Sequence, residues 1–227
     1  MQSEEISLSE RDFQIMRRGI SALAAYDKAK RTDTFRALAD VVEKGQTVFI
    51  GDSITEGFPL NELLPGKVLF NRGVGGDTSS ELLERLPYTV LALLPQKVFL
   101  QIGTNDLKAG MPQEQTVLNV RTALGQIRAA SPFAKIFVVG VYPVCLHDKF
   151  MSMPTGAHIL QGRTQEKIRE LNEKYCAMCG ELGAEFLDFT DILSDQEGDL
   201  REEYTTDGLH FTVSAYCELA KELKKYL

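Results

Sequence analysis

The amino-acid sequence predicts an α/β protein, a three-layer α/β/α sandwich around a five-stranded parallel sheet of the flavodoxin-like type. From residue 47 on, short apolar runs rich in β-branched and aromatic residues alternate with long helical stretches, as in right-handed βαβ units. A chain of 227 residues, 44% of them hydrophobic, is long enough to bury one core around such a sheet. The expected strands are 47–51, 67–71, 97–102, 135–141 and 184–188.

Helices are expected between these strands and after the last one, because their apolar residues recur at helical spacing. The longest irregular stretch, 143–160, contains two prolines and a glycine. A loop of that length in a compact domain often has a function. The expected helices are 78–93, 113–130, 161–182 and 213–226.

The region before the first strand is predicted to form two further helices, 8–27 and 34–44. The sequence therefore divides into an N-terminal helical extension, residues 1–45, packed on the core, and a main domain, residues 46–227. Apolar residues at helical spacing predict one apolar face on the first helix. Packing against the core is one role for this face, and a homodimer contact is the alternative. The apolar residues of the first helix are Phe13, Met16, Ile20 and Leu23.

The charge of the chain excludes several classes of partner. A net charge of −7 and a pI near 5.1 argue against nucleic acid or an anionic membrane surface as the main partner. No apolar run reaches the roughly 18–20 residues that span a bilayer, so membrane insertion is not expected. The first residues are acidic and lack the apolar region of a signal peptide, which predicts a cytoplasmic protein.

The four cysteines are expected to be free thiols. Cys176 and Cys179 form a CxxC pair, but they fall in a predicted helix, and no second pair of cysteines or histidines completes a zinc site. We therefore expect no metal. A redox or metal role for this pair is the alternative.

Ser53 follows the first predicted strand, at the edge where open α/β sheets bind ligands. A serine there can be the nucleophile of an acyl-transfer enzyme, or it can simply cap the next helix. Both roles are compatible, because the N–H groups at a helix N-terminus favour negative charge on a nearby oxygen.

Two more polar segments follow predicted strands. The glycine-rich segment 71–78 offers backbone N–H groups that a ligand can approach closely, or it forms a tight turn in which Asp77 or Thr78 caps the next helix. It lacks both common phosphate-loop patterns. Asn105 follows the third strand, where its amide can stabilise an oxyanion or form an Asx-turn.

A Ser-His mechanism has three histidines to choose from. His210 stands three residues after Asp207, a carboxylate that can fix its tautomer and stabilise the imidazolium. His147 and His158 fall in the irregular stretch and are better placed to line a substrate or face solvent. The sequence therefore favours His210 as the base.

These four segments together resemble the blocks of the SGNH hydrolases, also called the GDSL esterase/lipase family. The blocks are GDSITEG at 51–57, NRGVGGDTS at 71–79, GTND at 103–106 and DGLH at 207–210, in the family's order. The second block is similar to the branch of the platelet-activating-factor acetylhydrolase catalytic subunits. Residues 1–45 lie outside the resemblance.

The resemblance implies a role for each matched residue. Ser53 matches the nucleophile, which also offers its N–H to the oxyanion hole. The backbone N–H of Gly76 and the side chain of Asn105 match the rest of that hole. Asp207 and His210 match the orienting acid and the base.

The implied reaction is hydrolysis of short-chain acyl esters, acetyl first, through an acyl-enzyme and without a cofactor. The expected partner is a small-molecule ester. Acyl-thioesterase or lysophospholipase activity with the same residues is the alternative. Two further alternatives are a non-catalytic ligand-binding module and a flavin or nucleotide protein, and Asp52 and Glu56 would repel phosphate in the latter. The residues expected to line the substrate site are Asp52, Tyr142, His147, Phe150 and Met153.

Overall fold

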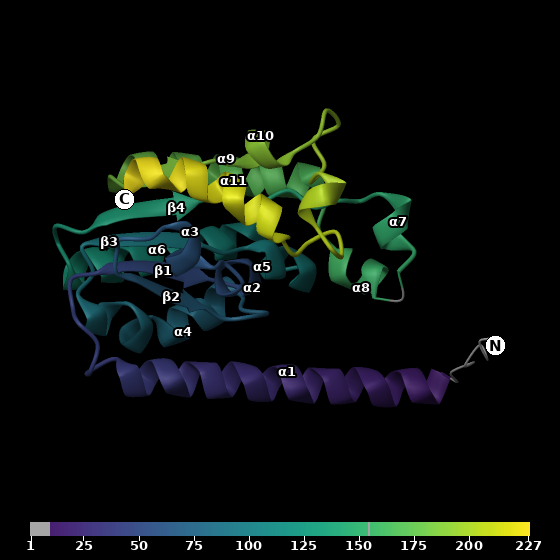
Figure 1. Cartoon of the computed structure of the whole chain (residues 1–227), viewed down its shortest axis with the longest axis horizontal. Coiled ribbons are helices and arrows are strands. Elements are labelled where there is room, and N and C mark those ends of the chain that lie inside the picture. Colours follow the sequence, from purple (N-terminus) through teal and green to yellow (C-terminus); the bar gives the residue numbers. More distant parts are fainter. Residues whose placement is uncertain (1–9, 154) are drawn as a thin grey trace.

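The computed structural model describes residues 10–153 and 155–227 (Figure 1). Its centre is a five-stranded, all-parallel sheet of order β2-β1-β3-β4-β5. This is the flavodoxin-like order, and with helices around the sheet it confirms the predicted fold class. The strands are β1 Thr47–Gly51, β2 Leu69–Gly73, β3 Lys97–Gln101, β4 Lys135–Val139 and β5 Glu185–Leu187.

Helices form the two outer layers. The α-helices are α1 Glu10–Leu38, α2 Ser53–Glu56, α3 Leu60–Leu63, α4 Ser79–Thr89, α5 Thr104–Ala109, α6 Gln113–Ala130, α7 Asp148–Met151, α8 Gly156–Leu160, α9 Gln165–Leu182, α10 Thr190–Leu193 and α11 Val213–Leu223. Short 3₁₀ helices are η1 Leu91–Leu93, η2 Glu202–Tyr204 and η3 Lys224–Tyr226. Helices α4, α6 and α9 contact one another in that order, and α11 packs beside α3 and α10. Within the described residues, no helix has the length and apolar character needed to cross a bilayer.

Stacked aromatic rings hold the middle of the sheet together. Phe49, Phe99 and Phe137 lie side by side on β1, β3 and β4, with centroid distances of 4.5 and 4.7 Å. Such a stack adds to the burial of three large rings. Because strands of a parallel sheet are covered on both faces, their neighbours on β1 and β3 are buried as well.

Several elements differ from the sequence expectation. Strand β2 covers 69–73 instead of 67–71, because its pairing with β1 continues until Gly73 lies opposite Gly51. The helix expected over 78–93 ends at Thr89, shortly after Pro87, and η1 follows. The stretch 143–160 is not wholly irregular, since it contains α7 and α8.

The two helices expected before β1 are one continuous helix, α1. The break predicted over 28–33 is wrong, because this segment contains neither glycine nor proline and is rich in residues that favour helices. The C-terminal part of α1 packs on the α/β unit, where Phe35 is 5% exposed.

The N-terminal part of α1 extends past this contact (Figure 1). Ile20 and Leu23, two members of its predicted apolar face, are 60% and 61% exposed. The side chains of the other two, Phe13 and Met16, lie outside the described residues. The homodimer contact and the domain division at 45/46 stay predictions.

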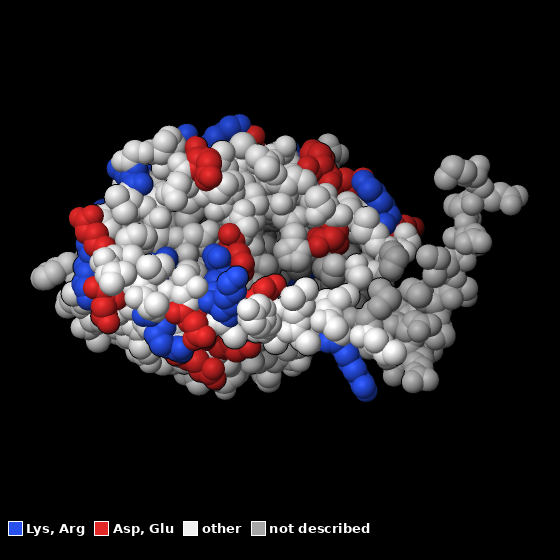
Figure 2. Space-filling model, turned by 60° about the horizontal axis from the view of Figure 1, so that its bottom comes forward, with Lys and Arg blue, Asp and Glu red and all other residues white. Residues whose placement is uncertain are grey.

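Ion pairs join α1 to the loop after β2. Lys28 lies 2.6 Å from Glu81 and 2.8 Å from Asp77, and Arg31 lies 3.5 Å from Glu56. Arg31 also donates a hydrogen bond to the carbonyl of Gly73. On the face of the molecule that carries α1, acidic and basic side chains lie interspersed (Figure 2). Helix α1 therefore supports the carboxyl end of β2.

Candidate active site

Ser53 lies where the strand order reverses, at the carboxyl end of β1 between β2 and β3. It is the first residue of α2. Asp52 caps this helix, because its Oδ1 accepts a hydrogen bond from the N–H of Ile54 at 3.0 Å. The turn needs glycine at position 51, since a Cβ there would lie 2.3 Å from the carbonyl oxygen of Gln101. Burial raises the pKa of Asp52 to about 7.

Ser53, His210 and Asp207 form one hydrogen-bonded chain. The Oγ of Ser53 lies 3.0 Å from Nε2 of His210, and Nδ1 of His210 lies 2.6 Å from Oδ2 of Asp207. Partial burial opposes ionisation of Asp207, but hydrogen bonds from His210 outweigh it and lower the pKa of this carboxyl to about 2. An ionised Asp207 accepts a hydrogen bond from the Nδ1–H group, and in this tautomer Nε2 can accept a hydrogen bond from the hydroxyl of Ser53.

A tight turn holds Asp207 and His210 together. Oδ1 of Asp207 accepts the backbone N–H groups of Leu209 at 3.0 Å and His210 at 2.8 Å. The hydroxyl of Thr205 donates to the carbonyl of His210 and accepts from the N–H of Gly208, both at 2.9 Å. The imidazole is therefore set against Ser53 by a local network.

The glycine-rich loop after β2 packs against Ser53. A Cβ on Gly75 would lie 3.8 Å from Cβ of Ser53, and the N–H of Gly75 donates to Glu56 at 2.6 Å. Gly76 has a φ of 75°, a conformation that favours glycine. Within the described residues its exposed N–H makes no hydrogen bond, so it is free to bind a ligand.

The next residue, Asp77, fixes this loop to the sheet. Its carboxylate is fully buried and lies 2.5 Å from Arg85 and 2.8 Å from Lys28. Arg85 also donates to the carbonyls of Gly51 at 2.9 Å and Arg72 at 2.8 Å, at the ends of β1 and β2. Thr78 forms the capping box of α4 with Glu81.

Asn105, in the first turn of α5, faces the same loop. Its Nδ2 donates to the carbonyl of Asp77 at 2.9 Å, and its Oδ1 accepts from Nη2 of Arg163 at 2.8 Å. One of its two amide N–H groups is therefore held, and the other is left for a ligand. The structure thus brings the loop of Gly76, the amide of Asn105 and the Ser53–His210 pair to one edge of the sheet.

The comparisons with known proteins identify the family of the chain. The family described as "GDSL-like Lipase/Acylhydrolase" matches residues 49–216. The chain belongs to this family.

Solved structures of GDSL-like proteins share the whole fold. A protein of Streptococcus pneumoniae, provisionally named a platelet activating factor, is 31% identical, with a TM-score of 0.84 over 94% of this chain and 98% of that one. A GDSL-like lipase of Bacteroides thetaiotaomicron has a TM-score of 0.74 at 21% identity, over 86% of this chain and 96% of that one. At that identity the likeness concerns the fold alone.

Curated relatives match over part of their length. The thioesterase 1/protease 1/lysophospholipase L1 of Escherichia coli K12 is 30% identical over 109 residues, which cover 43% of this chain and 50% of the relative. The N-acylneuraminate cytidylyltransferase of Escherichia coli O18:K1:H7 is 26% identical over 156 residues, 67% of this chain and 33% of the relative. The chain thus spans a third to a half of these relatives.

The expected substrate-lining residues differ in how far they are buried in this GDSL-like protein. Tyr142 and Phe150 are 7% and 1% exposed, and Asp52 is fully buried, so none of the three is open to a substrate. Each of the two rings packs into the core instead. His147 lies near the surface, 2.9 Å from Glu202, and Met153 is partly buried.

Several residues around the site were missed from the sequence. Arg163 contacts Asn105 and Lys28 contacts Asp77, but neither residue belongs to a sequence motif. Asp106, inside the third block, accepts the N–H and hydroxyl of Ser79 and thus ties α5 to the start of α4. Burial raises its pKa. Of these residues, Asp106 alone had a signal in the sequence, its place in the GTND block.

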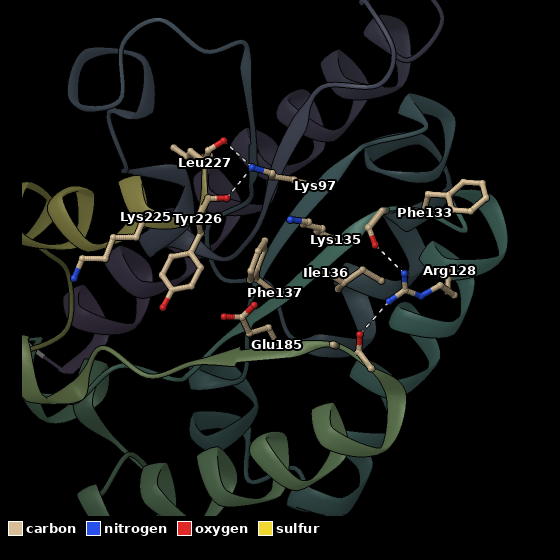
Figure 3. A pocket seen from close by; sticks show the side chains of 13 residues that line it. Lys97, Arg128, Phe133, Lys135, Ile136, Phe137, Glu185, Lys225, Tyr226 and Leu227 are labelled. Atoms are coloured by element: carbon tan, nitrogen blue, oxygen red, sulfur yellow. Dashed lines mark hydrogen bonds between the residues drawn. The ribbon is translucent and has the colours of Figure 1, made fainter.

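A large surface cavity lies elsewhere, beside the amino ends of β3 and β4 (Figure 3). Its volume is about 780 Å³, and its lining includes Lys97, Lys135 and Glu185. Arg128 in its wall donates to backbone carbonyls (Figure 3). Parallel strands bind ligands at their carboxyl ends, so this cavity is separate from the Ser53 site.

Proposed function

We propose that this enzyme hydrolyses short-chain acyl esters, acetyl first, with Ser53 as the nucleophile. The observation that carries the proposal is the chain of short contacts from Ser53 to His210 and Asp207, 3.0 and 2.6 Å. The free hydroxyl is a weak nucleophile, and a neutral imidazole in hydrogen-bond contact is the base that activates it.

In the first step, Nε2 of His210 takes the proton of Ser53 while Oγ attacks the ester carbonyl. Asp207 stabilises the imidazolium that forms. The oxyanion accepts hydrogen bonds from the N–H groups of Ser53 and Gly76 and from Asn105. His210 then protonates the leaving alcohol, and an acyl-Ser53 intermediate results.

In the second step, a water takes the place of the alcohol. His210 removes its proton while the water oxygen attacks the acyl carbon, and the same donors hold the second oxyanion. The carboxylic acid leaves and the proton returns to Ser53. The balance needs the ester and water alone.

A short acyl group is compatible with the close packing of the core beside α2. The interior space lined by Ile54, Phe58 and Tyr142 has a volume of about 20 Å³. That is room for about one water molecule, so this space cannot hold an acyl chain. The similar pneumococcal protein is named a platelet activating factor, and this name also supports a short acyl group.

Thioester or lysophospholipid hydrolysis is the second candidate. The Escherichia coli relative at 30% identity is named for these activities. The same nucleophile, base and oxyanion donors serve a thioester carbonyl, because the tetrahedral intermediate carries the same charge.

The test is hydrolysis of p-nitrophenyl acetate and p-nitrophenyl butyrate by the wild type, Ser53→Ala and the exposed control Ser152→Ala. We expect Ser53→Ala to lower kcat by roughly 10³-fold or more and Ser152→Ala to match the wild type. Acetate should be preferred over butyrate. Equal rates in wild type and Ser53→Ala would overturn the assignment of Ser53.

A further inference from the structure

Arg163, which follows α8, carries a buried charge without an ion pair. Its side chain is 2% exposed, and within the described part of the chain no carboxylate pairs with it. Burial lowers its pKa to about 10, which leaves the guanidinium charged near neutral pH. Asp52 and Asp207 favour the charged form of Arg163 at longer range, but neither forms an ion pair with it. Burial of a charge that lacks a directly paired carboxylate is costly, so its retention calls for a physical reason.

The guanidinium is held by neutral oxygens of α5 and α8. Nε donates to the hydroxyl of Thr104 and Nη2 to Oδ1 of Asn105, both at 2.8 Å. Nη1 donates to the carbonyl of Ile159. Two of the three contacts are therefore made to the first two residues of α5, one of which is the proposed oxyanion donor.

We propose that Arg163 is a positioning residue that sets the amide of Asn105 for oxyanion binding, an inference that rests on the function proposed above. An arginine donates and never accepts, so its neighbour must be the amide oxygen. The carbonyl of Asp77 accepts and never donates, so its neighbour must be Nδ2. Both contacts select the same orientation of the amide.

The selected orientation matters for the chemistry. A flipped amide would present its oxygen, in place of an N–H, to a developing oxyanion. The hydrogen bond from a cation also draws electron density from the amide oxygen, which makes the remaining N–H a stronger donor. Both effects favour the transition state over the bound ester.

A purely structural role for Arg163 is the competing explanation, since it also connects α8 to α5. A double-mutant cycle separates the two. The proteins are the wild type, Arg163→Gln, Asn105→Ala and the double variant, assayed with p-nitrophenyl acetate. Arg128→Gln is the matched control, because Arg128 also donates to carbonyls, in the distant cavity of Figure 3.

We expect Arg163→Gln to lower kcat about 10- to 100-fold with KM changed by less than about threefold, since one oxyanion donor is typically worth roughly 10²–10³ in kcat. In the Asn105→Ala background the same change should lower kcat by less than about threefold. Equal losses in both backgrounds would overturn the proposal while leaving the esterase assignment intact.

A second readout does not depend on turnover. The side-chain amide of Asn105 gives a pair of ¹H–¹⁵N signals that is identified by its loss in Asn105→Ala. We expect Arg163→Gln to shift this pair more than the other side-chain amides, and Arg128→Gln to leave it in place. An unmoved pair would overturn the proposal, even in a protein that hydrolyses no ester.

If Arg163→Gln does not fold, Arg163→Lys replaces it in both measurements. Lysine keeps the charge, but one ammonium group cannot span Thr104 and Asn105 in the way a guanidinium does. We therefore expect an intermediate loss of kcat and a shifted amide pair. Wild-type kcat and an unshifted pair in Arg163→Lys would contradict the positioning role.

Discussion

His210 and the carboxylate of Asp207 are joined by two hydrogen bonds. One joins Nδ1 to Oδ2 at 2.6 Å, and the other joins the histidine's backbone N–H to Oδ1 at 2.8 Å. Asp207→Asn keeps the shape but can donate to Nδ1, which favours the wrong tautomer for accepting the Ser53 proton. We predict a loss of kcat of about 10³- to 10⁴-fold in ester hydrolysis.

The control for this prediction is Glu203→Gln, which removes an exposed carboxylate from the same loop. We expect it to retain wild-type kcat. A similar loss in both variants would mean that the effect comes from loop charge, and full activity of Asp207→Asn would remove Asp207 from the mechanism.

The pH profile of activity separates His210 from Asp52. A base must be neutral, so kcat/KM should fall on the acid side when the base is protonated. Burial raises the pKa of Asp52 to about 7, so protonation of this carboxyl is the competing cause of such a fall. We predict that kcat/KM of Asp52→Asn still falls at acid pH. If the fall is absent in Asp52→Asn, the titrating group that controls activity is Asp52.

The buried Asp52 also predicts how stability changes with pH. Its pKa is raised from 3.8 to about 7 in the folded protein, so between these values the folded state holds a proton that the unfolded state has released. The contribution of Asp52 to the free energy of unfolding therefore falls as pH rises from about 4 to 7 and is constant above.

Asp52→Asn tests this, because the amide oxygen can still accept from the N–H of Ile54 and carries no titrating proton. Urea unfolding of both proteins at pH 5 and pH 8 measures the difference. We expect the variant to gain stability relative to the wild type at pH 8. Parallel pH dependence of the two proteins would show that Asp52 is not the titrating group.

Helix α1 should matter for catalysis although it lies outside the matched family region. Lys28 is one of two cations that contact the buried Asp77, next to Gly76. We predict that Lys28→Ala lowers kcat by roughly three- to tenfold. This factor corresponds to the loss of about 1 kcal/mol, the interaction energy of a partly exposed ion pair. The exposed Lys30→Ala, on the same helix, is the control, and equal effects of both would argue against a role for the Asp77 contact.

The strands could be predicted from the sequence, because a parallel sheet covered on both faces requires continuous apolar runs. The residues Ser53 and Asn105 followed from the same logic, since each comes directly after such a run. Asp207 and His210 are three positions apart, so their contact is local and visible in the sequence.

Long-range contacts could not be predicted in this way. Arg163 meets Asn105 across 58 positions of the chain, and no periodicity or spacing encodes that meeting. The continuity of α1 was also missed. Its middle segment forms long-range ion pairs, from Lys28 to Asp77 in the loop after β2 and from Arg31 to Glu56 of α2. Tyr142 and Phe150 were placed at the site from loop position, and packing buries them instead.

The most direct test of the central claim is covalent labelling of the nucleophile. A fluorophosphonate reacts with a serine that is activated by a histidine, and peptide mass spectrometry locates the label. We predict labelling at Ser53 in the wild type, none in Ser53→Ala and a much slower reaction in His210→Gln. Labelling elsewhere, or an unchanged rate in His210→Gln, would contradict a Ser53–His210 esterase.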